Sequence, residues 1–148
     1  MFKLILASKS LVRKEILIKH KIDVEVQPSY VDEDLIKDSL LKENATPEII
    51  SKNLAELKAN KISSKNLNSL VLGADSVIDL NGELISKPIN RDNAFDILKK
   101  LNNKKHYLIS SVCISKDGSM IWNHTDRAVL TMKNMTDQEL KKYLSKIT

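Results

Sequence analysis

The chain has 148 residues, of which 42% are hydrophobic and 29% are charged, and its formal net charge is +5. These values predict one globular domain, residues 1–148, that is large enough to bury a core. No apolar run is long enough to span a membrane, and the N-terminal apolar stretch is interrupted too early for a signal peptide. The single cysteine, Cys113, excludes an internal disulfide and a thiolate metal cluster, so we expect a cytoplasmic protein.

The positive charge does not by itself indicate a nucleic-acid partner. The lysines are spread along the chain, aromatic residues make up only 4% of it, and no basic run is interleaved with stacking side chains. We therefore expect no nucleic acid, and a basic nucleic-acid-binding domain is the weakest alternative. The charge would still favour the approach of an anionic small molecule.

Short apolar runs alternate with helical patterns along the whole chain. In chain order, the expected strands are residues 2–7, 24–27, 69–80, 83–86, 106–115 and 120–132. The expected helices are residues 10–20, 46–63, 90–101 and 136–148. This order combines crossovers with hairpins, so it predicts an α/β fold with a mixed β-sheet and flanking helices.

Local signals support several of these boundaries. Thr46 followed by Pro47 is a strong helix start, and Thr136 with Glu139 has the form of a capping box. Asn81-Gly82 is the strongest hairpin signal in the chain. In the first helix, apolar residues at helical spacing predict an inner face made by Val12, Ile16 and Leu17.

Two serines and an arginine stand where the first strand runs into the first helix. Ser8, Ser10 and Arg13 offer hydroxyls and a fixed cation, and arginine is scarce because only three occur in the chain. Together with backbone N–H groups at a helix start, such side chains suit phosphate oxygens. The alternative is that a serine caps the helix and Arg13 is a solvated surface charge.

Three further features could carry chemistry. Asp75 lies in an apolar strand, where a carboxylate must bind a metal, meet a cation or face a cleft, unless it simply faces water at a turn. Asp32, Glu33 and Asp34 form an acidic cluster that suits Mg²⁺ shared with a phosphate, or that simply begins a helix. Lys87 follows a hairpin strand and is either a site cation or one surface lysine among many. The common glycine-rich phosphate loops are absent.

Taken together, these pieces resemble the Maf family of nucleoside triphosphate pyrophosphatases, once described as septum-formation inhibitors. Six segments match the family in order: LASKSLVRKEIL at 6–17, VDE at 31–33, LAELKA at 54–59, GADSVIDLNGELISKP at 73–88, the strand at 106–112 and the strand and helix at 129–143. Each motif alone is weak, but six collinear matches over nearly the whole chain are highly specific.

The resemblance implies an inosine triphosphatase-like fold and hydrolysis of a nucleoside triphosphate to the monophosphate and pyrophosphate. It implies a divalent metal cofactor, Mg²⁺ or Mn²⁺, held by Glu33 and Asp75, with Asp75 as the proton acceptor. The substrate-binding positions that it implies are Ser8, Val12, Arg13, Lys58, Ser76 and Lys87.

The chain also departs from the family pattern. Val12 replaces the first arginine of the opening motif and Ser76 replaces a threonine, so the base preference is not assigned. The sequence ends at Thr148, before the family's last strands and its C-terminal specificity residue. We therefore expect a C-terminally shortened domain with an exposed apolar face and exposed strand edges.

The sequence thus predicts a Maf-type enzyme acting on acid anhydrides, with a nucleoside triphosphate as its partner molecule and a homodimer left open. The main alternative is a catalytically impaired nucleotide-binding or regulatory remnant of the family, which would keep the phosphate-binding cations without turnover.

Overall fold

The computed structural model describes residues 3–147 as an α/β fold with one mixed sheet. The strands are β1 (Leu4–Leu6), β2 (Val24–Val26), β3 (Val71–Leu80), β4 (Glu83–Ile85), β5 (Lys105–Lys116) and β6 (Ser119–Thr131). The helices are α1 (Leu11–Lys19), α2 (Glu33–Lys42), α3 (Pro47–Ser63), α4 (Arg91–Leu101) and α5 (Asp137–Ser145). No helix within residues 3–147 is both long and apolar enough to cross a membrane.

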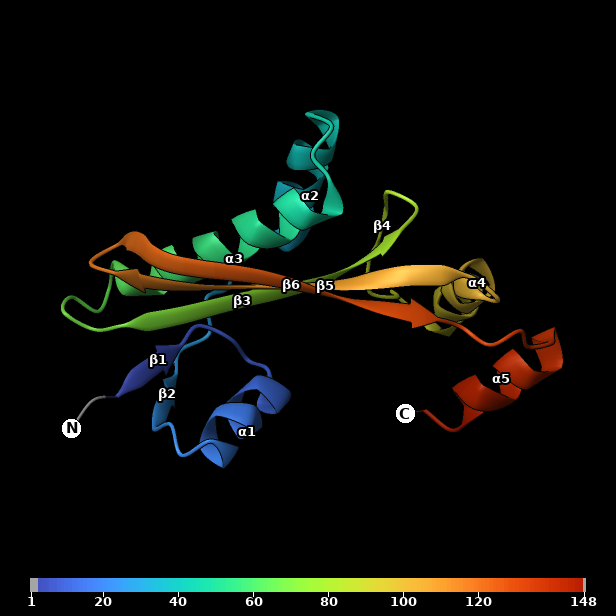
Figure 1. Cartoon of the computed structure of the whole chain (residues 1–148), viewed down its shortest axis with the longest axis horizontal. Helices are drawn as coiled ribbons and strands as arrows, with labels where there is room; N and C mark the ends of the chain where they lie inside the picture. Colours follow the sequence, from blue (N-terminus) through green and yellow to red (C-terminus); the bar gives the residue numbers. More distant parts are fainter. Residues whose placement is uncertain (1–2, 148) are drawn as a thin grey trace.

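The strand order is β2-β1-β3-β5-β6, with β4 paired to β3. β1 runs parallel to β2 and β3, whereas β3, β5 and β6 pair in antiparallel fashion. This arrangement confirms the predicted mixed sheet with flanking helices. Figure 1 shows α3 and α1 on opposite sides of the sheet, and the long strands β3, β5 and β6 run along the length of the molecule.

Helix α3 is the element that covers the long strands. It buries nine of its residues, and Ala55 and Ala59 pack with Cys113 of β5. A Cβ atom added to Gly73 of β3 would lie 2.3 Å from the carbonyl oxygen of Ala55 and 2.8 Å from the Cβ atom of Ala59. Only glycine at position 73 therefore allows α3 to lie this close to β3. The short distance between helix and strand sets how far the polar side chains of α3 extend toward the residues of β3.

The hairpin predicted at Asn81-Gly82 forms, and a second hairpin turns at Asp117-Gly118. Asn81-Gly82 joins β3 to β4 and Asp117-Gly118 joins β5 to β6, and all four residues have positive φ angles. Such backbone angles match the tight turns that connect twisted antiparallel strands. The capping box at Thr136 is also present.

Three expectations need correction. The acidic segment after β2 forms a helix, α2, that the sequence pattern did not place in the element order. Helix α1 buries none of its residues, and Val12 is 66% exposed, so the expected inner face of that helix is wrong. Helix α5 ends at Ser145. The expected strand start at Phe2 and the helix end at Thr148 lie outside the described residues.

Strand β6 forms one edge of the sheet and is exposed over almost its whole length. Its large apolar side chains at the surface are Met120, Ile121, Trp122, Val129 and Leu130. The exposed strand edge expected from the sequence is therefore present within the described residues.

Candidate active site

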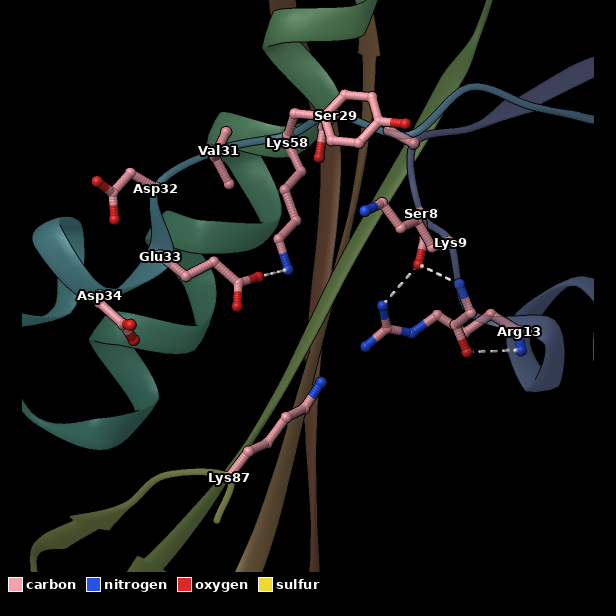
Figure 2. Close-up of a pocket in the computed structure, with 13 residues that line it drawn as sticks. Ser8, Lys9, Arg13, Ser29, Val31, Asp32, Glu33, Asp34, Lys58 and Lys87 are labelled. Atoms are coloured by element: carbon pink, nitrogen blue, oxygen red, sulfur yellow. Dashed lines mark hydrogen bonds and ion pairs between the residues drawn. The ribbon is translucent and has the colours of Figure 1, made fainter. Parts of the chain in front are cut away.

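A cavity of about 730 Å³ lies where β1 ends and α1 and α2 begin. It is lined by the β1–α1 connection with Arg13, by residues 29–34, by Lys58 of α3 and by Lys87 beyond β4. Ligands of α/β sheets bind outside the carboxyl ends of parallel strands, which is where β1 and β2 end here. Figure 2 shows Glu33 and Lys58 on one side, Ser8 and Arg13 on the other, and Lys87 entering between them.

One wall of the cavity is built by the β1–α1 connection. The hydroxyl oxygen of Ser8 accepts hydrogen bonds from Nη1 of Arg13 at 3.0 Å and from the backbone N–H of Ser10 at 3.2 Å. The hydroxyl of Ser10 caps α1 by accepting from the N–H of Arg13 at 3.2 Å. The capping interpretation is therefore correct for Ser10, but Arg13 faces the cavity and is not simply a solvated charge.

Only one N–H group of the Arg13 guanidinium donates to a protein acceptor within the described part of the chain. A guanidinium carries five such donors in a fixed fork. The remaining donors are available to an anion in the cavity, and carboxylate or phosphate oxygens match their geometry.

The opposite wall is a cluster of one ammonium and two carboxylates from three elements. Nζ of Lys58 on α3 donates to Oδ1 of Asp75 on β3 at 3.1 Å and forms an ion pair with Glu33 at the start of α2. The side chains of Lys58 and Asp75 are only 11% and 8% exposed. Oδ2 of Asp75 is buried without a hydrogen-bond partner in the described residues. A buried carboxylate oxygen left unpaired in this way is unusual.

The two carboxylates of this cluster respond differently to their surroundings. Burial raises the pKa of Asp75 above its ordinary value, and the charge and hydrogen bond of Lys58 offset only part of that effect. Burial acts in the same direction on Glu33, but there the hydrogen bond and charge of Lys58 prevail and hold the pKa below its ordinary value. The site thus pairs a carboxylate that ionises easily with one that resists ionisation.

Helix α3 also holds the main chain of Asp75. The hydroxyl of Ser51 donates to the carbonyl oxygen of Asp75 at 3.0 Å, and Ser51 is fully buried. Ser51 and Lys58 are seven residues apart, so they lie on the same face of α3 two turns from each other. Ser51 does not stand out in the sequence, where its one signal is this spacing from Lys58.

The comparisons with known proteins agree with this fold. The family model described as "Maf-like protein" matches residues 3–148. The chain belongs to this family. A nucleoside triphosphate pyrophosphatase of Pelagibacter ubique (strain HTCC1062) is 66% identical over 145 residues, which cover 98% of this chain and 74% of that protein. A 7-methyl-GTP pyrophosphatase of Brucella abortus biovar 1 (strain 9-941) is 33% identical over 98% of this chain and 73% of its own length.

Solved structures with much lower sequence identity share the fold. A HAM1 protein from Coxiella burnetii superposes with a TM-score of 0.56 at 13% identity, covering 87% of this chain and 71% of its own. A nucleoside-triphosphatase (dITP/XTP pyrophosphatase) from Mycobacterium abscessus gives a TM-score of 0.54 at 12% identity, covering 88% of this chain and 74% of its own. The expected inosine triphosphatase-like architecture is thus confirmed.

The structure gathers most of the predicted site residues of this Maf-like chain but not all. Ser8, Arg13, Glu33, Lys58 and Lys87 line the cavity, and Asp75 lies behind Lys58 without lining it. Their roles in binding and catalysis stay predictions.

Two predicted residues lie outside the cavity. Val12 is exposed on α1 and is not among the lining residues. Ser76 is exposed on β3, where its hydroxyl lies 2.9 Å from that of Ser110 on β5. Successive residues of a strand point to opposite faces, so Ser76 faces away from Lys58. The two positions expected to influence base choice therefore do not contact the cavity as it stands.

The residues present fit a divalent cation that is shared with a substrate. Within residues 3–147 no three His, Cys, Asp or Glu side chains come together as a complete metal cage. Mg²⁺, however, is commonly held by one or two carboxylates together with substrate phosphates and waters. Glu33 and Asp75 provide two carboxylates that already share one cation, Lys58, and Oδ2 of Asp75 is an unused ligand oxygen.

Proposed function

We propose that this chain hydrolyses a nucleoside triphosphate to the nucleoside monophosphate and pyrophosphate in this cavity. The main support is that Arg13, Lys58 and Lys87 converge on one cavity beside the Glu33 and Asp75 carboxylates. Phosphoryl transfer depends mainly on positioning and on neutralising the charge of the phosphate oxygens. The cavity also has the size of a small-molecule site. The names of the relatives support the same reaction class.

Two cations of the chain, Arg13 and Lys87, would bind different phosphate groups of the substrate. Arg13, positioned by Ser8, would clamp phosphate oxygens through its free N–H groups. Lys87 is exposed and lines the cavity, so it would hold the departing pyrophosphate as a mobile point charge. These contacts act on phosphates and do not depend on the base.

Asp75 would act as the proton acceptor. One proton of the attacking water passes to its carboxylate, the water oxygen bonds to the attacked phosphorus, and the anhydride bond between the α- and β-phosphates breaks. The raised pKa of Asp75 makes its carboxylate a stronger base than an exposed aspartate. A divalent ion held by Glu33 and Asp75 would supply Lewis-acid neutralisation of the phosphate and lower the pKa of a bound water.

The proposal also covers the location of the protein, its oligomeric state and its base preference. A cytoplasmic location is supported by the free, buried thiol of Cys113, the chain's one cysteine. A homodimer stays a prediction, which light scattering on the purified protein checks. The base preference is left open because Val12 and Ser76 lie outside the cavity.

The test is a product analysis with a panel of nucleotides that includes the standard triphosphates, inosine triphosphate and 7-methyl-GTP. The purified chain is incubated with each nucleotide and Mg²⁺ or Mn²⁺, and the monophosphate, pyrophosphate and inorganic phosphate are measured separately. We expect monophosphate and pyrophosphate in equal amounts. Release of inorganic phosphate alone would contradict the proposal. Tight binding of triphosphates without any turnover would favour the impaired-remnant alternative.

A further inference from the structure

Lys58 occupies the centre of the cluster of acidic groups in the cavity wall. Its ammonium contacts Glu33 of α2 and Asp75 of β3 at once, and only 11% of its side chain is exposed. The other charges that act on these carboxylates are the lysines Lys37 and Lys87, which influence Glu33 over a longer range. Lys58 is thus the cation that directly balances two carboxylates in a poorly solvated place.

The charges in this cluster do not balance completely. Two carboxylates against one ammonium leave a net charge of −1, and Oδ2 of Asp75 has no partner within the described residues. Taking the ammonium away would leave two carboxylates close together with reduced solvation, which is strongly unfavourable without another cation. The space around Nζ of Lys58 therefore has the chemistry of a cation site.

We propose that Lys58 is an internal counter-ion that fills this cation site in the empty protein and competes there with a divalent metal. Metal binding to the carboxylates requires the ammonium to leave. A lysine has a flexible four-carbon stem, and Lys58 already lines the cavity that contains Arg13 and Lys87. Phosphate oxygens in the cavity would give the ammonium a second set of anionic partners.

The exchange couples the binding of metal and nucleotide. Without nucleotide, the ammonium stays on the carboxylates and a free metal ion binds weakly. A triphosphate draws Lys58 away and frees Glu33 and Asp75, so each ligand strengthens the binding of the other by the same factor. This second step rests on the proposed function, whereas the competition between Lys58 and metal does not.

The test measures Mn²⁺ binding to the full chain without nucleotide, by titration calorimetry and by the electron paramagnetic resonance signal of free Mn²⁺. We expect Lys58→Met to bind Mn²⁺ at least about tenfold more tightly than the parent, because a competing positive charge has been removed. The matched control is Lys52→Met, which removes the same charge from an exposed position on α3 whose one ion-pair partner in the described part of the chain is Glu48. This control should bind Mn²⁺ as the parent does.

A double variant identifies the site at which Lys58→Met binds Mn²⁺ more tightly. Adding Glu33→Gln to Lys58→Met should remove most of the increase in Mn²⁺ affinity, because one of the two carboxylates is gone. Unchanged or weaker Mn²⁺ binding by Lys58→Met would overturn the proposal. A gain that survives Glu33→Gln would also overturn it, because the ion would then bind elsewhere.

Loss of the counter-ion could also unfold the variant, so a stability measurement accompanies the titration. Mn²⁺ should raise the melting temperature of Lys58→Met more than that of the parent, or restore its folding if it is unfolded in chelator. A variant that Mn²⁺ neither stabilises nor refolds contradicts the proposal.

The coupling step is tested separately with a non-hydrolysable triphosphate. This ligand should increase Mn²⁺ affinity in the parent more than in Lys58→Met. Equal increases in both proteins would overturn the coupling. Absence of turnover in the parent, with these binding results intact, would contradict the proposed function alone.

Discussion

The two walls of the cavity are built in different ways. The α3–β3 wall carries Lys58 and Asp75, and its helix buries nine residues against the sheet. The β1–α1 wall carries Ser8 and Arg13, and its helix buries none. One wall is therefore held in place by packing, whereas the other is held mainly by hydrogen bonds in the connection before α1.

This contrast predicts different roles for the two walls in turnover and in binding. Proton transfer needs a carboxylate whose position is fixed to a fraction of an ångström, and the main chain of Asp75 is held by Ser51 and by the close packing at Gly73. Phosphate groups of different nucleotides can be clamped by a guanidinium that adjusts its position. We therefore expect changes in the α3–β3 wall to reduce turnover and changes in the β1–α1 wall to reduce binding.

The largest effect is expected from Asp75→Asn. This change keeps the size of the side chain but removes the proton acceptor, so kcat should fall about 10²–10⁴-fold while the circular dichroism spectrum is unchanged. The matched control is Asp79→Asn on the same strand, where the side chain accepts a hydrogen bond from the N–H of Gly82 in the hairpin. That variant should retain parental turnover, and an Asp75→Asn protein with parental turnover would show that Asp75 is not the base.

The pH dependence sharpens the same prediction. The base must be ionised, and burial raises the pKa of Asp75 above the ordinary aspartate value of 3.8. Activity should therefore be complete at high pH and fall as the pH decreases through this raised pKa. The residual activity of Asp75→Asn should lack that acidic limb. The measurement is kcat/KM across the acidic range in which both proteins stay folded.

The next largest effect is expected from Glu33→Gln. If Glu33 holds the metal, the Mg²⁺ or Mn²⁺ concentration that gives half-maximal activity should rise at least about tenfold. Asp38→Asn removes the same kind of charge from an exposed position on the same helix that does not line the cavity, so it serves as the control. An unchanged half-saturation concentration in Glu33→Gln would show that Glu33 does not hold the metal and is only an acidic residue in the first turn of α2.

A smaller effect, on affinity alone, is expected from Arg13 in the opposite wall and from Lys87, which enters the cavity between the two walls. Arg13→Ala and Lys87→Ala should each weaken triphosphate binding about tenfold while leaving nucleoside binding nearly unchanged, because we expect both cations to bind phosphates and not the base. Lys14→Ala, one residue beyond Arg13 and outside the cavity lining, is the control. Titration calorimetry with a nucleoside and its triphosphate separates the two contributions. Equal losses for both ligands would indicate a structural effect instead.

The smallest effect is expected from Ser51→Ala, which removes the hydrogen bond to the main chain of Asp75. We expect a loss of about 1 kcal/mol of stability and a kcat that falls several-fold with KM unchanged. The control is Ser63→Ala on the same helix, where a fully buried hydroxyl accepts from the N–H of Gly118 in the β5–β6 turn. It should lose similar stability without the fall in kcat. Matching kcat values in the two variants would mean that Ser51 has only a structural role.

The sequence predicts the parts of this molecule whose signals are local. The turn at Asn81-Gly82 and the cap at Thr136 follow from residue types that favour those backbone shapes. Helix α2 was left open because its acidic start suited either a helix or a metal ligand. The structure shows that Asp32 caps this helix and that Glu33, in its first turn, forms an ion pair with Lys58, whereas the metal-ligand role of Glu33 stays a prediction.

The site was predicted less completely than the fold. Motif resemblance placed Arg13, Glu33 and Lys58 in one site, and all three line the cavity. No periodicity, however, could show that Lys58 bridges two carboxylates or that Ser51 holds Asp75, because these contacts depend on how closely α3 approaches β3. That distance is set by the absence of a side chain at Gly73, which becomes meaningful only once the helix and the strand are paired.

The most direct test of the two-wall account is steady-state kinetics of the parent, Asp75→Asn and Arg13→Ala on one triphosphate under identical conditions. We expect Asp75→Asn to lose kcat at a nearly parental KM and Arg13→Ala to raise KM with kcat nearly retained, provided that substrate binding equilibrates before the chemical step. The reverse pattern, or equal losses of kcat in both variants, would contradict the claim that the α3–β3 wall performs the chemistry and the β1–α1 wall binds the phosphates.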